Sequence, residues 1–189
     1  MTRATCSQIS LLLGSVGVSS LAAEDVARLT VGGLFVGSTP LVVALASAAM
    51  LGIGALTSRG GDGVTLVGTT ALLLNVLVRV FGRGVLGTPP DQVSWFLTLL
   101  ALAVPLLIVV AGVIAARTTG RRSWQVLGVG LVTGGVLWFA GNWFPTAHLL
   151  LFVIIEFINI ALVTVLLCWP AGGRVVSVLR QLWSSAAVR

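Results

Sequence analysis

Residues 147–168 read AHLLLFVIIEFINIALVTVLLC, and this stretch decides the class of fold. Its strongly polar side chains are His148, Glu156 and Asn159, and nearly all of the others are apolar. An α-helix needs about 20 such residues to cross a hydrocarbon core near 30 Å thick. The sequence therefore predicts a membrane-spanning helix here, with one ionisable side chain close to its middle.

The chain as a whole has the composition of a membrane protein. Of its 189 residues, 57% are hydrophobic and 8% are charged, and the mean hydropathy is +1.11. Soluble domains carry roughly 25% charged residues. This difference excludes an ordinary soluble domain, a disordered chain and a secreted disulfide scaffold. We predict an all-α integral membrane protein with one domain over 1–189: five to six transmembrane helices plus a short C-terminal amphipathic helix.

Four further apolar runs are long enough to span a membrane, and turn-forming or charged residues bound them. They are residues 31–57, 64–81, 93–116 and 124–141. Residues 9–23 are ambiguous, because Arg3 and residues 20–22 resemble the ends of a signal peptide, whereas Gly14 and Gly17 interrupt the apolar core. We interpret 9–23 as a sixth, short or tilted helix. A helix lying on the membrane surface and a signal segment are the alternatives.

The basic residues predict the orientation. All eleven are arginine, and most lie in short loops, where membrane topology explains the net charge of +6 better than nucleic-acid binding does. Counted over alternate loops, one side receives Arg3, Arg59, Arg117, Arg121, Arg122, Arg174, Arg180 and Arg189, and the other receives Arg28, Arg79 and Arg83. Because basic loops stay inside, we expect a multi-pass protein of the plasma membrane with both termini in the cytoplasm.

The C-terminal residues 173–188 have a different pattern. Arginines 174 and 180 alternate with valine, leucine and tryptophan at roughly helical spacing. This pattern favours a basic amphipathic helix lying on the inner leaflet beside anionic lipid. A frayed cytoplasmic tail is the alternative.

Glu156 is the first member of a candidate intramembrane cluster. Helical spacing places His148, Glu156 and Asn159 on one stripe, and an ionisable group at that depth must face protein or water. A second polar stripe, Asn75 and Arg79, lies on residues 64–81 at a compatible depth. Three interpretations remain open: a functional pocket, a structural Arg79–Glu156 pair, and an Arg79 that extends to the headgroups. A pair predicts that replacing both partners with leucine restores the stability that either single change removes.

No catalytic motif is present, so the sequence favours a function other than catalysis; an enzyme would have to use the Glu156 cluster on a lipid or a quinone-like molecule. Cys6 and Cys168 are too few and too far apart for a disulfide framework or a zinc site, and His148 is the single histidine. We therefore expect no cofactor and no metal.

Small residues at helical spacing indicate close helix packing. They form two sets, Ala44, Ala48 and Gly52, and Gly130, Gly134 and Gly141. Besides the lipid bilayer, we expect partners at these faces, either other membrane subunits or further copies of the chain. The favoured function is an accessory or assembly subunit of a larger membrane complex. The alternative is a small transporter or proton-coupled carrier that uses Glu156, although the early spans do not align with the late ones as an inverted repeat.

Overall fold

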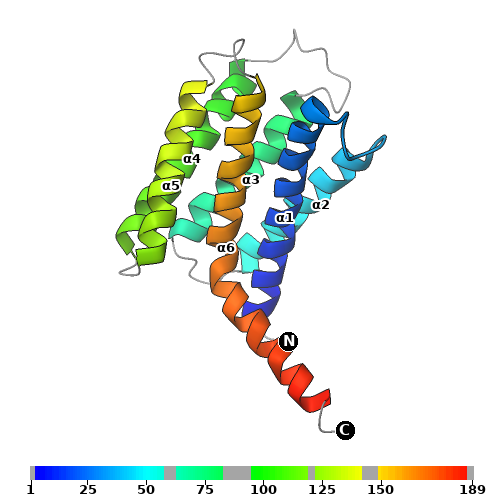
Figure 1. The fold of residues 1–189 in the computed structure, drawn as a ribbon, viewed down its shortest axis with the longest axis vertical. Coiled ribbons are helices and arrows are strands. Elements are labelled where there is room, and N and C mark those ends of the chain that lie inside the picture. The colour runs from blue at the N-terminus through cyan, green and yellow to red at the C-terminus, as the bar shows by residue number, and fades with distance from the viewer. Residues whose placement is uncertain (1–2, 58–62, 83–94, 119–121, 142–148, 187–189) are drawn as a thin grey trace.

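The computed structural model describes residues 3–57, 63–82, 95–118, 122–141 and 149–186. Within these ranges the chain forms six α-helices. The turn between the first two helices, residues 31–38, is also described. The helices are α1 (Arg3–Thr30), α2 (Thr39–Thr57), α3 (Gly63–Gly82), α4 (Trp95–Thr118), α5 (Arg122–Gly141) and α6 (Leu149–Ala186). The predicted all-α fold is therefore confirmed for the described residues (Figure 1).

Each of the six helices is long and apolar enough to cross a membrane. The qualifying segments are Cys6–Thr30, Thr39–Thr57, Gly63–Phe81, Thr98–Arg117, Arg122–Gly141 and Leu149–Cys168. This length and composition are those of membrane-spanning helices. Of the two expected numbers of spanning helices, five or six, the larger one fits the structure.

The junction between α1 and α2 differs from the expected boundaries. α1 continues to Thr30, where the sequence predicts a shorter helix over 9–23, and α2 begins at Thr39 although the apolar run begins at residue 31. Gly32, Gly33 and Gly37 have φ angles of 89°, 104° and 60°. Glycine adopts such angles at little cost. These glycines place the first residues of the apolar run in a turn.

The glycines that interrupt residues 9–23 are contact points between α1 and α2. A Cβ atom on Gly14 would lie 2.7 Å from Leu51 Cγ, and one on Gly17 would lie 2.1 Å from Ser47 Oγ. Glycine therefore lets the two helices approach closely. This packing compensates for the low helix propensity of glycine, so α1 stays regular where the sequence suggests a break.

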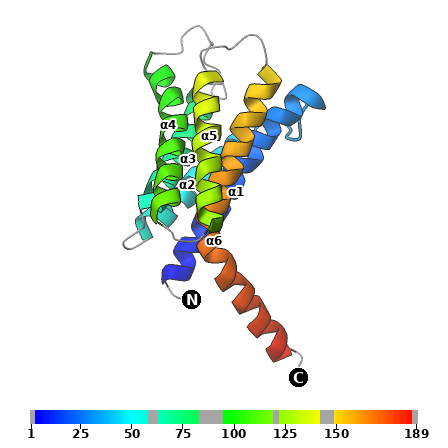
Figure 2. The same cartoon turned by 60° about the vertical axis from the view of Figure 1, so that its left-hand side comes forward.

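α6 continues through Pro170 as far as Ala186. The separate surface helix predicted for 173–188 is, as far as it is described, the C-terminal part of this one long helix. It extends beyond the bundle at the end where the N-terminus lies (Figures 1 and 2). Proline removes a backbone hydrogen bond and commonly ends or kinks a helix, and for that reason the sequence indicates a boundary there.

The helices form a closed ring in chain order. Consecutive helices run in opposite directions and pack together, α6 closes the ring against α1, and α3 also meets α6 in the interior (Figures 1 and 2). The contacts within α1–α2 and α4–α5 are the most extensive. At most 1% of the surface of each central core side chain is exposed, and these side chains include Val18, Leu72, Ile108, Leu131 and Ile160.

The ring order explains why no inverted repeat is found. In an inverted repeat, a twofold axis in the membrane plane relates the two halves of the chain. Such an axis reverses both the direction of each helix and the order of the helices around the ring. Here α4 runs opposite to α1, but α4, α5 and α6 follow one another in the same sense as α1, α2 and α3. The six described helices therefore do not form an inverted three-helix repeat.

The α4–α5 contact gives a direct test of the fold. A Cβ atom on Gly128 would lie 2.6 Å from the carbonyl oxygen of Gly112 and 2.7 Å from the backbone nitrogen of Ala116. We expect Gly128→Ala to lower the free energy of unfolding by about 1–3 kcal/mol, because the two backbones must separate. Thermal unfolding in detergent measures this effect.

Gly52→Ala is the matched control, because a Cβ atom on Gly52 meets nothing within 4 Å. Its melting temperature should equal that of the unchanged protein or exceed it slightly, since alanine has the higher helix propensity. Equal melting temperatures for the Gly128 and Gly52 variants would contradict the close approach of α4 and α5.

Candidate functional site

Arg79 of α3 lies at the centre of a buried polar cluster. Its Nη2 donates to Glu156 Oε1 of α6 over 2.5 Å, and its Nε donates to Asn75 Oδ1 over 2.7 Å. Asn75 Nδ2 donates to the same Glu156 oxygen over 3.2 Å. The exposed fractions of Asn75, Arg79 and Glu156 are 3%, 6% and 3%. The structure thus brings three of the five predicted site residues into one hydrogen-bonded group.

The other side of the guanidinium faces α1. Arg79 Nη1 pairs with the Asp25 carboxylate and also donates to the Leu21 carbonyl oxygen over 3.2 Å. Sequence reasoning missed Asp25, because the helix predicted over 9–23 ends before it. The signal was present: if the helix continues to Thr30, Asp25 lies inside a spanning segment, where an ionisable group must face protein or water.

The cluster lies toward one end of the bundle. Arg79 and Asp25 are near the C-terminal ends of α3 and α1, and Glu156 is in the first half of the spanning part of α6. Because alternate helices run in opposite directions, these positions lie at the same end of the ring (Figure 1). Three helices distant in the sequence therefore contribute the three charged side chains.

Asn159 is buried beside the cluster but makes different contacts. Its Nδ2 donates to the Ile155 carbonyl oxygen over 2.8 Å, and its side chain occupies the space next to Gly134 of α5. Its Oδ1 has no hydrogen-bond partner among the described residues. His148, the fifth predicted site residue, lies outside the described residues. The structure therefore separates Asn159 from the hydrogen bonds of Arg79.

Two small cavities flank the Arg79 side chain. One, of about 100 Å³, lies between α3, α4, α5 and α6, and its lining residues are Asn75, Val78, Arg79, Ala101, Val104, Trp138, Phe152 and Glu156. The other, of about 60 Å³, lies between α1, α2 and α3, and its lining residues are Leu21, Glu24, Asp25, Arg28, Pro40, Ala44, Arg79 and Val80. Arg79 contributes to both walls, whereas Glu156 lines the first cavity and Asp25 lines the second.

Glu24 stabilises the turn that follows α1. Its Oε2 accepts hydrogen bonds from the backbone nitrogens of Leu34 and Phe35 over 2.6 Å and 3.0 Å. Its Oε1 accepts from Arg28 Nε over 2.8 Å, with the Arg28 side chain 55% exposed. Glu24 therefore holds the glycine-rich turn against the helix end, whereas its neighbour Asp25 belongs to the cluster.

These contacts explain how charged side chains remain inside an apolar bundle. An ionisable side chain at the centre of a spanning helix costs roughly 2.5–3.5 kcal/mol on insertion scales. Arginine has five N–H groups and does not lose its proton in proteins. Arg79 makes four hydrogen bonds to described acceptors, which are on Asn75, Leu21, Asp25 and Glu156. Intramembrane charges held in this way mark a candidate functional site.

The chemistry available here is proton exchange and charge pairing. The cluster combines two carboxylates, one amide and one guanidinium. Among the described residues, no group of three or more His, Cys, Asp and Glu side chains is placed to hold a metal ion. The two carboxylates and the guanidinium form one group of paired ionisable side chains.

Comparisons with known proteins found no matching family model, no matching curated protein and no matching solved structure. The fold and the site define the class: a multi-pass helical bundle with a buried charged cluster shared by α1, α3 and α6. Its function is argued from that cluster.

Asp25 changes the expected result of removing charges. The Arg79→Leu/Glu156→Leu double variant keeps the Asp25 carboxylate but removes the guanidinium that pairs with it. We expect Arg79→Leu to cost about 3–5 kcal/mol of stability and Glu156→Leu to cost less, because Arg79 then retains Asp25. Only the triple variant, with Asp25→Leu added, should recover most of the loss. Thermal unfolding in nanodiscs gives all four values, and full recovery in the double variant would contradict a role for Asp25.

Proposed function

We propose that the chain is a small transporter of the plasma membrane that carries protons, with the Arg79 cluster as its proton-binding site. One observation carries this proposal. A single guanidinium is shared between two carboxylates, Asp25 of α1 and Glu156 of α6, that approach it from different helices. Each carboxylate lines its own cavity.

Proton binding would change which helix Arg79 holds. A protonated carboxyl group is neutral and loses its charge pairing with the guanidinium. When Glu156 takes up a proton, Arg79 retains Asp25 and α1, and when Asp25 takes it up, Arg79 retains Glu156 and α6. Proton occupancy then favours one arrangement of the helices over another, which is the differential interaction that a coupled conformational change requires.

The surroundings of the two carboxylates differ in polarity. The cavity beside Asp25 is also lined by the charged side chains of Glu24 and Arg28 on α1, and α2 contributes Pro40 and Ala44. The cavity beside Glu156 is also lined by the amide of Asn75 on α3, and α4 and α5 contribute Ala101, Val104 and Trp138.

The size of the cavities limits what they can hold. A water molecule takes about 30 Å³ of liquid volume. Cavities of about 100 and 60 Å³ therefore suit a few waters or a small ion. The cavities therefore leave room for a hydrated proton, as this function requires.

The orientation belongs to the same proposal. Arg117 and Arg122 lie at the end of the bundle opposite the Arg79 cluster, and α1 begins and α6 ends on that basic side. Short basic loops favour the cytoplasmic side. The Arg79 cluster then lies in the outer half of the membrane, and both termini are cytoplasmic.

Proton flux into liposomes tests the carrier function. The protein is reconstituted into liposomes loaded with the pH dye pyranine, and a potassium diffusion potential set with valinomycin drives proton entry. We expect Glu156→Gln and Asp25→Asn to reduce the flux about tenfold or more, because an amide cannot take up the proton.

Thr70→Ala is the control, because its hydroxyl donates to the Leu66 carbonyl oxygen of its own helix, away from the cluster. It should transport like the unchanged protein. Unchanged flux in both amide variants, with melting temperatures near that of the unchanged protein, would contradict the proposal.

A subunit of a larger membrane complex is the second candidate, favoured by one observation. Two glycines of the predicted partner faces are occupied within the chain, Gly134 by Asn159 and Gly141 by Phe152. The space beside Gly52 is not occupied, since a Cβ atom there meets nothing within 4 Å. Of the small residues of α2, Ala44 is buried within the chain, whereas the space beside Gly52 is open to a second helix.

Native mass spectrometry in a mild detergent distinguishes the two candidates. A subunit should co-purify with partner chains at fixed stoichiometry, and Gly52→Leu should release them because the added side chain fills the contact. A homogeneous monomer without partners, equal for the unchanged and Gly52→Leu proteins, would contradict the subunit function and leave the carrier.

A further inference from the structure

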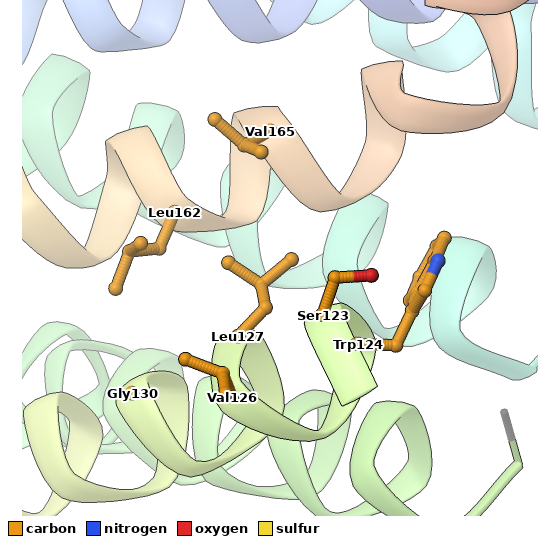
Figure 3. Close-up of a pocket in the computed structure, with 7 residues that line it drawn as sticks. All are labelled: Ser123, Trp124, Val126, Leu127, Gly130, Leu162 and Val165. Carbon is orange, nitrogen blue, oxygen red and sulfur yellow. The ribbon is translucent and has the colours of Figure 1, made fainter. Parts of the chain in front are cut away.

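A groove between α5 and α6 has a lining very different from that of the polar cluster. Its volume is about 330 Å³, and its lining residues are Ser123, Trp124, Val126, Leu127, Gly130, Leu162 and Val165. Figure 3 shows Leu162 of α6 and Leu127 of α5 extending into the space between the two helices. Small-molecule sites commonly occupy about 300–1,000 Å³ and are mostly apolar. The groove is therefore large enough for an apolar ligand.

The groove exists because α5 and α6 pack less closely than α4 and α5 do. On the α4 side, Gly128 and Gly135 of α5 bring the backbones into close contact. On the α6 side, Gly130 leaves a gap instead, since a Cβ atom there would have Leu162 Cδ1 as its nearest neighbour, 3.7 Å away. Val126 and Val165 at its edge are exposed, so the groove opens sideways to the surrounding acyl chains.

Basic side chains lie at one end of the groove. Exposed Arg122 directly precedes the lining residues Ser123 and Trp124, and exposed Arg117 ends the adjacent spanning part of α4. Tryptophan favours the level of the lipid headgroups. The described acidic side chains, Glu24, Asp25 and Glu156, all lie toward the other end of the bundle. The mouth of the groove is thus positively charged and its body is apolar.

We propose that this groove binds one acyl chain of an anionic phospholipid, with the phosphate of the headgroup at Arg122. The apolar lining accommodates the chain, and the guanidinium supplies a charge-assisted contact to the phosphate. The charge at the mouth selects an anionic over a zwitterionic lipid of the same chain length. This inference is independent of the carrier proposal, because it uses none of the residues around Arg79.

Lipid titration followed by native mass spectrometry tests the proposal. The purified full chain in detergent is titrated with phosphatidylglycerol or with phosphatidylcholine of identical acyl chains. We expect phosphatidylglycerol to be retained more tightly. Gly130→Leu should weaken its retention about tenfold or more, because the new side chain occupies the groove.

Gly52→Leu is the matched control, since it adds the same side chain at an open glycine of α2. It should bind phosphatidylglycerol like the unchanged protein. Arg122→Gln should remove the preference for phosphatidylglycerol, whereas Arg28→Gln, at the opposite end of the bundle, should keep it. If Gly130→Leu fails to fold, Val165→Phe fills the groove from the α6 side and should have the same effect.

Three results would overturn the proposal. The first is equal retention of the two lipids by the unchanged protein. The second is unchanged phosphatidylglycerol retention in both groove-filling variants. The third is a dimer of the unchanged protein that Gly130→Leu converts to a monomer with no change in lipid retention, which would assign the groove to a second copy of the chain.

Discussion

The structure depends on satisfying one permanent positive charge inside an apolar bundle. Arginine side chains carry five N–H donors and a lasting positive charge in proteins, so Arg79 needs acceptors wherever α3 places it. It finds them on α3 itself, on α1 and on α6. These bonds require α1 and α6 to lie against α3 at that depth, and the ring closes through the α1–α6 contact, where Ser19 and Thr164 share a 2.8 Å hydrogen bond.

Much of the fold could be predicted, because length and hydropathy are sufficient to identify a spanning helix. The boundaries around residues 23–39 could not, because apolar residues in a glycine-rich turn have the same composition as the start of a helix. That error hid Asp25. The spacing of Asn75 and Arg79 and the position of Glu156 did indicate a cluster, since each depends on periodicity within one helix. Asn159 is not bonded to Arg79, and its side chain lies against Gly134 of α5 instead. The periodicity within α6 cannot predict a contact with another helix.

Glycine contacts determine where the bundle is tight and where it is open. Gly14 and Gly17 bring α1 against α2, and Gly112 and Gly128 bring α4 against α5. The same residue type has the opposite effect at Gly130, where no facing backbone fills the space and a groove results. A small-residue pattern therefore predicts that backbones can approach, but the neighbouring helix decides whether they do. For this reason, some positions of the partner faces expected from the sequence, such as Gly134, are occupied by side chains of the chain itself, whereas Gly52 is open.

The order of the chain also decides when the buried charges become paired. α1 carries Asp25 and precedes α3, so a guanidinium entering with α3 can meet a carboxylate already in place. Glu156 lies on α6, the last helix in chain order, and pairs with the same Arg79 that Asn75 and Asp25 contact. Each new charge after the first thus enters beside a partner, which reduces the cost of inserting it. An arginine paired with Glu156 alone would have its carboxylate only on the last helix of the chain, whereas Asp25 provides one on the first.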